Sequence, residues 1–383
     1  MSINSLSLKS LKLGTKNLLI NTANGRWAFV DDEVIHALQS NKFAPDLYQA
    51  CIKLLTKYGI IDVSKSMSSE EKYISLLTGN MLKLIILKVT SLCNLRCRYC
   101  YYYPLPYLSS SSSGGWEYLQ PTLSDQKMSY TIAEMTINLL EDYVSTMMSK
   151  TKSLSIVLEF HGGEPLLAAD VILHIIKLVR RSKNLRHVVH FAIQTNGTIA
   201  TDEALMALKN IGSAGISLDG PPEINDMCRI FPDGTGSYDV IAENIEEYRR
   251  HGIQVGLLAV YHKGSEGKIL RIVEHFVEDL NIRSFRINPL IRQGRALHRM
   301  VPNIDAFCKD IIKLIDWLIE RNKEIDKADE MIFEANIAHA VEKILGLKPG
   351  DVCEHIPCGA GTEMINIAPN GVVYACDHLP GSK

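Results

Sequence analysis

The sequence predicts an α/β fold in which six strand–helix units form an open, partial parallel barrel between two smaller segments. Three observations predict this fold. Strand-like and helix-like segments alternate from residue 80 to about residue 300. Before them, residues 1–75 show two strand-like runs and then two helix-like runs. Cysteines cluster directly after the first strand of the alternating region and again near the end of the chain.

The composition indicates a globular protein with a sizeable core. Of its 383 residues, 46% are apolar and 22% charged, which is ordinary for a chain of two to three domains. The formal net charge of −2 gives no basic excess, so we expect no nucleic-acid partner. The sequence shows neither a signal peptide nor a run of about 18 apolar residues, so we expect a cytoplasmic protein without membrane contact.

The first domain, residues 1–75, is expected to have a strand–strand–helix–helix layout. Asn17–Asn21 and Trp27–Val30 have the composition of strands. Asp31 is a candidate cap for the first helix, and a second helix is expected from Pro45 to Tyr58, where Gly59 would end it.

The barrel region, residues 80–300, is expected to place functional residues at the carboxyl ends of parallel strands. A serine-rich insertion at Pro104–Gln126 interrupts its first unit and is expected to be a mobile loop. The expected strands are Leu82–Val89, Leu154–Phe160, Val188–Gln194, Ala214–Leu218, Gln254–Val260 and Ser284–Asn288. The expected helices are Tyr130–Met148, Asp170–Arg181, Thr201–Ile211, Ser237–His251 and Lys268–Leu280.

The segment after the barrel divides into a helical connector, residues 301–349, and a compact tail, residues 350–383. The connector contains a long helical pattern near Asp305–Arg321. In the tail, Met364–Ala368 and Val372–Ala375 flank a Pro-Asn-Gly turn signal, which predicts a β-hairpin.

Three cysteines in eight residues carry the chemistry that the sequence suggests. Cys93, Cys97 and Cys100 follow the first barrel strand directly. Three thiolates on one loop can bind three irons of a 4Fe–4S cubane, and the fourth iron is then left without a protein ligand. The alternative is a zinc site, but zinc needs a fourth cysteine or histidine, and none follows before His161.

This cysteine segment resembles the CX3CXΦC signature of the radical S-adenosylmethionine (SAM) superfamily. The resemblance implies a TIM-like partial (β/α)6 radical SAM barrel and a [4Fe–4S] cluster on Cys93, Cys97 and Cys100. It also implies that Tyr99 lies near the adenine of SAM. Enzymes of this family cleave SAM reductively to a 5′-deoxyadenosyl radical, with electrons from a low-potential donor such as flavodoxin or ferredoxin.

A second motif, Gly162-Gly163-Glu164-Pro165, ends the second strand and resembles the family motif that holds the amino group of SAM. Its glycines allow the backbone to approach the ligand, and Glu164 supplies an acceptor for an ammonium group. On its own the tetrapeptide would be read as a turn. Its place at a strand's carboxyl end, one unit after the cysteines, favours the binding role.

Further matches resemble the peptide-modifying and sulfatase-maturing branch of the superfamily. By this resemblance Ser217 and Arg229 contact the carboxylate of SAM, and Asn196 lies in the same pocket. The planar fork of an arginine suits a carboxylate, although a surface ion pair is the ordinary alternative for Arg229. The branch often has histidine where this chain has Asn225.

The tail resembles the opening of the SPASM/twitch extension, which carries auxiliary iron–sulfur clusters. The resemblance implies that Cys353, Cys358 and Cys376 ligate an auxiliary [4Fe–4S] cluster. Three cysteines do not complete a four-thiolate site, so we expect the extension to be truncated. Asp377 resembles the aspartate proposed as the proton acceptor in sulfatase-maturing relatives. Enclosure is expected to raise the pKa of Asp377, and turn capping is its alternative role.

Two enzymatic functions fit this pattern. In the first, the enzyme modifies a ribosomally synthesised precursor peptide, for example by a crosslink. The layout of residues 1–75 is similar to winged-helix domains that capture leader peptides, and this favours the first function. The second function is anaerobic formylglycine formation on a sulfatase. A truncated, inactive peptide-binding fragment is a third reading, which the intact cysteine motif disfavours.

Overall fold

The computed structural model describes residues 8–13, 16–21, 27–39, 45–57, 81–102, 127–149, 151, 154–345, 352–353 and 358–377. Contacts between residues divide the chain into two compact units. The first unit comprises Met1–Met81 and His339–Thr362, and the second comprises Leu82–Ala338 and Glu363–Lys383. The expected insertion at Pro104–Gln126 lies outside the described residues.

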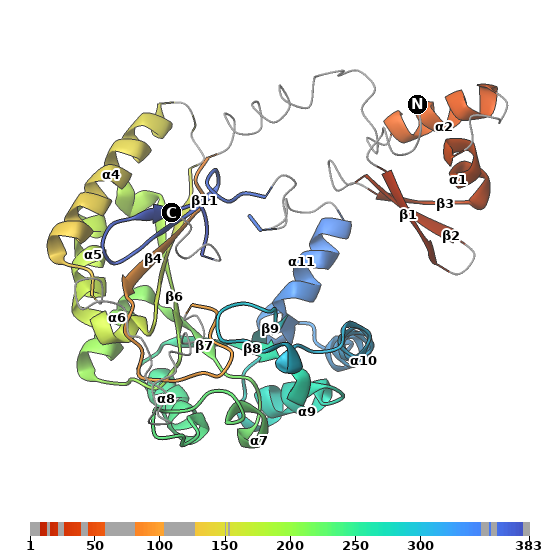
Figure 1. Cartoon of the computed structure of the whole chain (residues 1–383). Coiled ribbons are helices and arrows are strands. Elements are labelled where there is room, and N and C mark those ends of the chain that lie inside the picture. Colours follow the sequence, from red (N-terminus) through yellow and green to blue (C-terminus); the bar gives the residue numbers. More distant parts are fainter. Residues whose placement is uncertain are drawn as a thin grey trace, which may run out of the picture. The chain divides into compact units, whose positions relative to one another are not determined.

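The first unit contains a three-stranded antiparallel sheet and two helices (Figure 1). The strands are β1 (Leu8–Leu13), β2 (Lys16–Asn21) and β3 (Trp27–Val30), and the helices are α1 (Asp32–Gln39) and α2 (Pro45–Lys57). Leu19 of β2, Leu38 of α1 and Leu55 of α2 are buried together and form its core. The sequence analysis missed β1, whose two lysines weaken the strand pattern of Leu8–Leu13.

The second unit contains a nine-stranded sheet in the order β10-β9-β8-β7-β6-β5-β4-β11-β12. Its six central strands are parallel to one another and lie within two residues of the expected bounds, which confirms the open barrel. These strands are β4 (Leu84–Thr90), β5 (Ile156–Gly162), β6 (Val189–Thr195), β7 (Ser213–Ser217), β8 (Gln254–Tyr261) and β9 (Ser284–Pro289). A two-residue strand, β10 (Phe333–Glu334), adds to β9.

Helices connect the strands and cover the outer face of the sheet, as Figure 1 shows for α4, α5 and α6. Alternation along β5 explains this cover, since Ile156, Leu158 and Phe160 are buried while Glu159 and His161 on the opposite face are half-buried. The helices are α4 (Tyr130–Met148), α5 (Ala169–Arg181), α6 (Asp202–Ile211), α7 (Pro222–Asn225), α8 (Tyr238–Arg250), α9 (Ile269–Glu274), α10 (Ile304–Asn322) and α11 (Ala335–Ile344). None of the described helices is long and apolar enough to cross a membrane.

The expected hairpin in the tail is present, and it also extends the barrel sheet. β11 (Met364–Ile367) pairs antiparallel with β12 (Val373–Tyr374) across the turn at Gly371, whose φ of +83° suits glycine. β11 in addition pairs parallel with β4, the first barrel strand. This second pairing was not predicted, because a hairpin signal is local and gives no information on a distant partner strand.

Candidate functional site

The cysteine loop follows β4 and is held from two sides by backbone hydrogen bonds. The amides of Arg96 and Arg98 donate to the carbonyls of Ile230 and Cys228, at 2.7 and 2.9 Å. On the other side, the carbonyl of Cys100 accepts from the amide of Arg295 at 2.9 Å. Segments after β7 and β9 therefore fix the loop that carries the three thiols.

The three thiols lie in an environment that disfavours their free thiolates. Burial raises the pKa of Cys93 to about 12 and that of Cys97 to about 11. Iron stabilises the thiolate form, so the set fits a [4Fe–4S] cluster with three protein ligands. Within the described residues, no three metal-binding side chains surround one point for a single ion. A cubane does not need such a point, because each thiolate binds a different iron.

The two glycines of the second motif bring the end of β5 against the cysteine loop. A Cβ atom at Gly162 would lie 2.2 Å from the carbonyl oxygen of Thr90, and one at Gly163 would lie 2.2 Å from that of Leu92. The amide of Gly163 also donates to the carbonyl of Thr90 at 2.9 Å. The close approach that requires glycine here is therefore between two backbone segments, whereas the sequence analysis attributed it to the ligand.

Glu164 is fully buried, and protein groups occupy both of its carboxylate oxygens. One oxygen accepts from the hydroxyl of Thr195 at 2.6 Å and from the amide of Leu166 at 3.1 Å. The other accepts from the amide of Asn196 at 2.6 Å. Burial raises the pKa of Glu164 to about 7, although these hydrogen bonds oppose the rise. Glu164 thus connects β5 to the end of β6.

Asn196 connects the end of β6 to the cysteine loop. Its side-chain amide donates to Asn94 at 2.8 Å and lies 3.9 Å from the sulfur of Cys93. Its side-chain oxygen accepts from the amide and the hydroxyl of Thr198, and Asn94 donates to that same hydroxyl at 2.7 Å. The structure therefore brings Cys93, Glu164 and Asn196 into one connected cluster.

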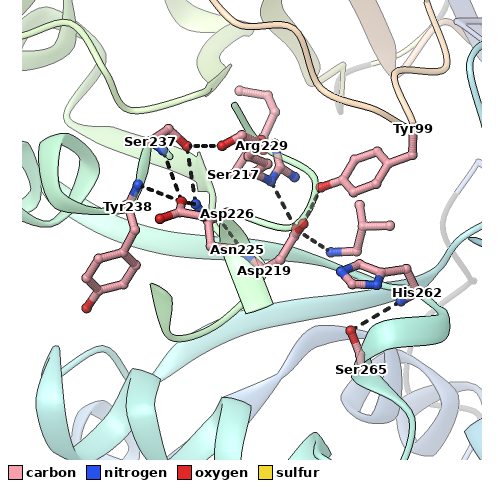
Figure 2. Close-up of polar contacts among 12 residues, drawn as sticks. Tyr99, Ser217, Asp219, Asn225, Asp226, Arg229, Ser237, Tyr238, His262 and Ser265 are labelled. Atoms are coloured by element: carbon pink, nitrogen blue, oxygen red, sulfur yellow. Dashed lines mark hydrogen bonds and ion pairs between the residues drawn. The ribbon is translucent and has the colours of Figure 1, made fainter. Parts of the chain in front are cut away.

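A second cluster forms around Asp219, which is completely buried after β7 (Figure 2). Its carboxylate accepts from the hydroxyl of Tyr99, from Nε of Arg229 at 3.0 Å and from the amide of Val260 at 3.0 Å. The guanidinium of Arg229 lies 5.4 Å from the centre of the Tyr99 ring. Asp219 raises the pKa of Arg229 although burial opposes it, and burial raises that of Tyr99. Arg229 is thus buried, and the surface ion pair considered for it is excluded.

Asn225 connects Asp219 to Asp226 and Ser237 (Figure 2). Its side-chain oxygen accepts from the amide of Asp219 at 3.3 Å, and its nitrogen donates to Asp226 at 2.9 Å and to Ser237 at 3.2 Å. The hydroxyl of Ser237 in turn donates to the carbonyl of Arg229 at 2.8 Å. One amide thus serves one donor and two acceptors, which explains why asparagine suits this position.

Ser217 stands at the end of β7, beside the Asp219 cluster in Figure 2. Its hydroxyl accepts a hydrogen bond from the side chain of Gln194 at 2.9 Å. Ser217 is half-buried, and its contact to a SAM carboxylate stays a prediction.

Asp377, directly after Cys376, lies in a third cluster together with Lys88 of β4. Oδ1 of Asp377 is 2.7 Å from Nζ of Lys88, and Oδ2 accepts from the hydroxyl of Tyr101. The ammonium group of Lys88 also lies 4.0 Å from the centre of the Tyr102 ring. Burial alone would raise the pKa of Asp377, but the electrostatic interactions with His161 and Lys88 and the hydrogen bonds with Lys88 and Tyr101 lower it. The expectation of a raised pKa is therefore wrong.

The tail cysteines are divided between the two compact units. Cys353 and Cys358 are exposed and belong to the first unit, whereas Cys376 is half-buried in the second. None of these three described cysteines forms a disulfide bond. Their role as ligands of an auxiliary cluster stays a prediction.

Sequence reasoning missed three residues that organise the site. Asp219 was given no role, although its position between the end of a strand and Arg229 was a usable signal. Asn94 lies inside the cysteine motif, in which only the three cysteines and Tyr99 were assigned a role. A Cβ atom at Gly294 would lie 2.2 Å from the carbonyl oxygen of Cys100. No sequence motif around Gly294 indicated this close approach to the cysteine loop.

Comparison with known proteins assigns this arrangement to a family. The family described as "Radical SAM superfamily" matches residues 87–276, which include the cysteine loop and the strands β5 to β8. The chain thus carries a radical SAM domain and is a radical SAM enzyme. Its cofactors are those of the family, a [4Fe–4S] cluster and SAM.

Among related sequences, the cysteine-type anaerobic sulfatase-maturating enzyme of Clostridium novyi is 28% identical over 306 residues. The alignment covers 77% of this chain and 73% of that enzyme. Among solved structures, native anSMEcpe with bound AdoMet and Cp18Cys peptide has a TM-score of 0.62 at 19% identity, covering 79% of this chain and 75% of that one. SuiB of Streptococcus suis bound to precursor peptide SuiA has a TM-score of 0.53 at 13% identity, covering 98% of this chain and 83% of that one. The structural likenesses establish a shared fold.

Proposed function

We propose that this enzyme uses SAM to modify a ribosomally synthesised precursor peptide. Its cluster is held by Cys93, Cys97 and Cys100, and its SAM by Tyr99, Gly162, Gly163, Glu164, Asn196, Ser217 and Arg229. The observation that carries the proposal is the junction at Asn196, which lies 3.9 Å from the sulfur of Cys93 and shares a hydrogen bond with buried Glu164. Hydrogen bonds therefore connect the cysteine loop to the ends of β5 and β6.

When bound, the cluster supplies the electron that cleaves SAM into methionine and a 5′-deoxyadenosyl radical. The protein residues have to orient SAM against the cluster. Asp219 fixes Arg229 through Nε, so the terminal nitrogens of the guanidinium are the donors for the carboxylate of SAM. The hydroxyl of Ser217, the last residue of β7, adds a neutral donor for the carboxylate of SAM.

Glu164 is proposed to act on the amino group of SAM indirectly, by holding in place the backbone that binds this group. Both of its carboxylate oxygens accept from protein groups, so a direct ion pair with an ammonium group would compete with Thr195 and Asn196. The carbonyl groups at the end of β5 remain the acceptors that Glu164 and the two glycines hold in position.

The first unit supports a peptide substrate. Its sheet has the order β1-β2-β3, so β1 and β3 are edge strands that an extended leader peptide can join by main-chain hydrogen bonds. The likeness to SuiB, which was solved with its precursor peptide, covers 98% of this chain, whereas the likeness to anSMEcpe covers 79%. We propose that residues 1–75 form a winged-helix-like leader-binding domain before the barrel at 80–300.

Asp377 is proposed to accept a proton from the substrate after hydrogen abstraction. Its lowered pKa keeps it ionised at neutral pH, so a proton can be received. The substrate then loses one hydrogen atom to the radical, and one proton and one electron in the oxidation that follows. Cys353, Cys358 and Cys376 lie in the proposed SPASM/twitch opening at 350–383, after a connector at 301–349. They are proposed as the ligands of an auxiliary [4Fe–4S] cluster, which would receive this electron.

Formylglycine formation on a sulfatase is the second candidate. The 28% identity to a cysteine-type anaerobic sulfatase-maturating enzyme over 77% of the chain favours it. Both candidates share SAM cleavage, hydrogen abstraction and the proposed role of Asp377. They differ in the elemental composition of the modified peptide.

The deciding experiment is mass spectrometry of peptides incubated with the anaerobically reconstituted enzyme, SAM and dithionite. Two substrates are compared, a precursor peptide encoded beside the enzyme and a sulfatase peptide with its target cysteine. A crosslink removes two hydrogen atoms and keeps every heavy atom, whereas formylglycine formation from cysteine removes two hydrogen atoms and also exchanges sulfur for oxygen. Modification of the sulfatase peptide alone would overturn the first proposal, and failure to cleave SAM at all would indicate an inactive fragment.

A further inference from the structure

The long helix α10 carries an apolar stripe that the described residues leave largely uncovered. Ile304, Ile312 and Ile319 are 65%, 60% and 63% exposed. Cys308, which is exposed, and half-buried Ile315 lie on the same side of the helix. These five residues follow one another at intervals of three or four, so they form one continuous stripe along α10. A helix usually turns such a stripe toward a partner, and exposed apolar side chains in a row therefore indicate an interaction surface.

Another side of α10 fixes the helix on the barrel. Leu314 and Leu318 are buried on this side. The carboxylate of buried Asp310 accepts from the hydroxyl of Tyr261 at 2.7 Å and from the amide of Gly267 at 2.7 Å. The helix also packs beside α9 (Figure 1). Rotation of α10 would break these contacts, so the apolar stripe stays on the surface of the second unit.

Charged side chains along one flank of the apolar stripe alternate in sign. In chain order they are Asp305, Lys309, Asp316 and Lys323, and all four are exposed. Spacings of four and seven residues return each of them to nearly the same flank of the helix. Asp305, Lys309 and Asp316 form no ion pair with another described residue. Lys323 lies 3.9 Å from Glu320, which is farther round the helix.

This order of charges is its own complement in the reverse direction. We propose that the enzyme forms a homodimer in which α10 packs antiparallel against α10 of a second copy. The two-fold axis passes near Ile312, so that Lys309 of each copy faces Asp316 of the other and the apolar stripes interdigitate. The acidic start of one helix, with Asp305, then lies beside the basic end of the other, with Lys323.

A second copy suits this surface better than a partner of one charge sign. The flank carries two acidic and two basic residues, so neither a strongly acidic nor a strongly basic surface gains from the four charges together. A two-fold dimer requires the same patch to complement itself, and the flank of α10 meets this requirement. The dimer does not depend on the proposed reaction, because α10 carries none of the residues assigned to the cluster or to SAM.

The test measures the dimer dissociation constant of the anaerobically reconstituted full chain by sedimentation equilibrium at about 1–100 µM. Ile312→Glu and Ile319→Glu each place a charge in the apolar stripe and should each raise the constant at least about thirtyfold. The matched control is Leu139→Glu on α4, where the replaced side chain is 62% exposed, and it should leave the constant unchanged. All three side chains are exposed, so each variant should keep the melting temperature of the parent.

An exchange of charges tests the antiparallel orientation. Lys309→Asp sets two acidic groups opposite each other at two places in the dimer and should weaken it about tenfold. Lys309→Asp/Asp316→Lys restores opposite charges at both places and should return the dissociation constant to within about threefold of the parent. In a parallel pair Lys309 would not face Asp316, and the double variant would not recover. A rise in salt from about 0.05 M to about 0.5 M should shrink the effect of Lys309→Asp.

Four results would overturn the dimer proposal. A parent that sediments as a monomer at about 100 µM would show that a second copy does not cover the stripe. Dimers of Ile312→Glu and Ile319→Glu as tight as the parent would place the interface elsewhere, as would equal dissociation of Leu139→Glu. A double charge variant that stays as weak as Lys309→Asp would refute the antiparallel orientation.

Discussion

Lys88 and Asp377 form a buried ion pair that joins the first barrel strand to the end of the tail hairpin. Nζ of Lys88 lies 2.7 Å from Oδ1 of Asp377, and the side chain of Lys88 is 1% exposed. The residue proposed to accept the substrate's proton is therefore fixed by the strand that leads into the cysteine loop. The proposed proton acceptor in the tail and the cysteine loop are therefore both attached to β4.

We expect the contributions of Lys88 and Asp377 to the free energy of unfolding to be coupled. Asp377→Asn leaves the ammonium group of Lys88 buried without its counter-charge and should cost about 3–5 kcal/mol in the free energy of unfolding. The double variant Lys88→Met/Asp377→Asn removes both charges and should recover most of that loss. Urea unfolding of the parent, both single variants and the double variant measures the coupling. Additive losses would show that the pair is not coupled.

The same variants separate structure from catalysis. If Asp377 accepts the proton, product formation should fall about 100-fold or more in Asp377→Asn, while SAM cleavage continues. The double variant should regain stability without regaining product. Product and 5′-deoxyadenosine are quantified together by liquid chromatography. Recovery of product in the double variant would mean that Asp377 acts only through stability.

Replacement of Cys97 by alanine should abolish SAM cleavage and lower the iron content after anaerobic reconstitution. Cys228, which is buried beside Cys97 and lies outside the cysteine motif, provides the matched control. Cys228→Ala should keep the iron content and the activity of the parent. Iron analysis and 5′-deoxyadenosine formation test both variants. Full activity in Cys97→Ala would refute the cluster assignment.

Asp219→Asn should weaken both the fold and the affinity for SAM. The substitution removes the charge that faces buried Arg229 and should cost about 3–5 kcal/mol. Because Arg229 loses its anchor, the KM for SAM should rise about tenfold or more. Calorimetry and steady-state kinetics measure the two effects. The exposed Asp233→Asn is the control and should change neither.

Glu164 gives the stability of the enzyme a pH dependence of defined sign. Its pKa is about 7 in the fold against an ordinary value of 4.5, so the folded state holds the proton more tightly than the unfolded state. The resulting stability is fully present below pH 4.5 and is lost as the pH rises through about 7. The loss should be on the order of 3 kcal/mol, since one pKa unit is worth about 1.4 kcal/mol.

Glu164→Gln tests this dependence. The variant cannot titrate, so its free energy of unfolding should vary less than that of the parent between about pH 5 and pH 8. It should also lose about 1–3 kcal/mol at low pH, because the side chain of glutamine has one oxygen only, and its NH2 group cannot accept in place of the carboxyl oxygen that the amide of Asn196 uses. Exposed Glu243→Gln should follow the parent curve. A variant with the same slope as the parent would show that another group causes it.

The core of the first unit offers a test of leader binding. Leu19 is 0% exposed, and Leu19→Ala should destabilise this unit by about 2–5 kcal/mol. If the unit binds the leader, peptide modification should fall while SAM cleavage without peptide continues. Leu54, half-exposed on α2, is the matched leucine whose replacement should have little effect. Equal loss of both reactions in Leu19→Ala would contradict a separate role in peptide binding.

The sequence predicted the elements whose signals are local. The alternation of strand-like and helix-like segments predicted the six barrel strands to within two residues of their observed bounds. The hairpin at Gly371 was recognised from its turn residues. The strand β1 was missed because Lys9 and Lys12 dilute its apolar pattern. The pairing of β11 with β4 was missed because register between distant strands depends on the whole fold.

The site was predicted as a set of residue types and less well as a set of contacts. The cysteine motif was recognised from its spacing, and the role of Arg229 was assigned from the resemblance to the family. The use of Glu164 by Thr195 and Asn196 was not predictable, because a carboxylate accepts equally well from an ammonium group, a hydroxyl or an amide. The sign of the Asp377 pKa shift was wrong because Lys88 and His161, far away in sequence, outweigh burial.

The parallel pairing of β11 with β4 has a consequence for synthesis on the ribosome. β4 is among the first barrel segments to emerge, but the partner for one of its edges emerges only near residue 364. Until then that edge presents unpaired amides and carbonyls beside a nearly continuous apolar strand. Nascent chains should therefore depend on chaperones and aggregate when translation stalls within the connector.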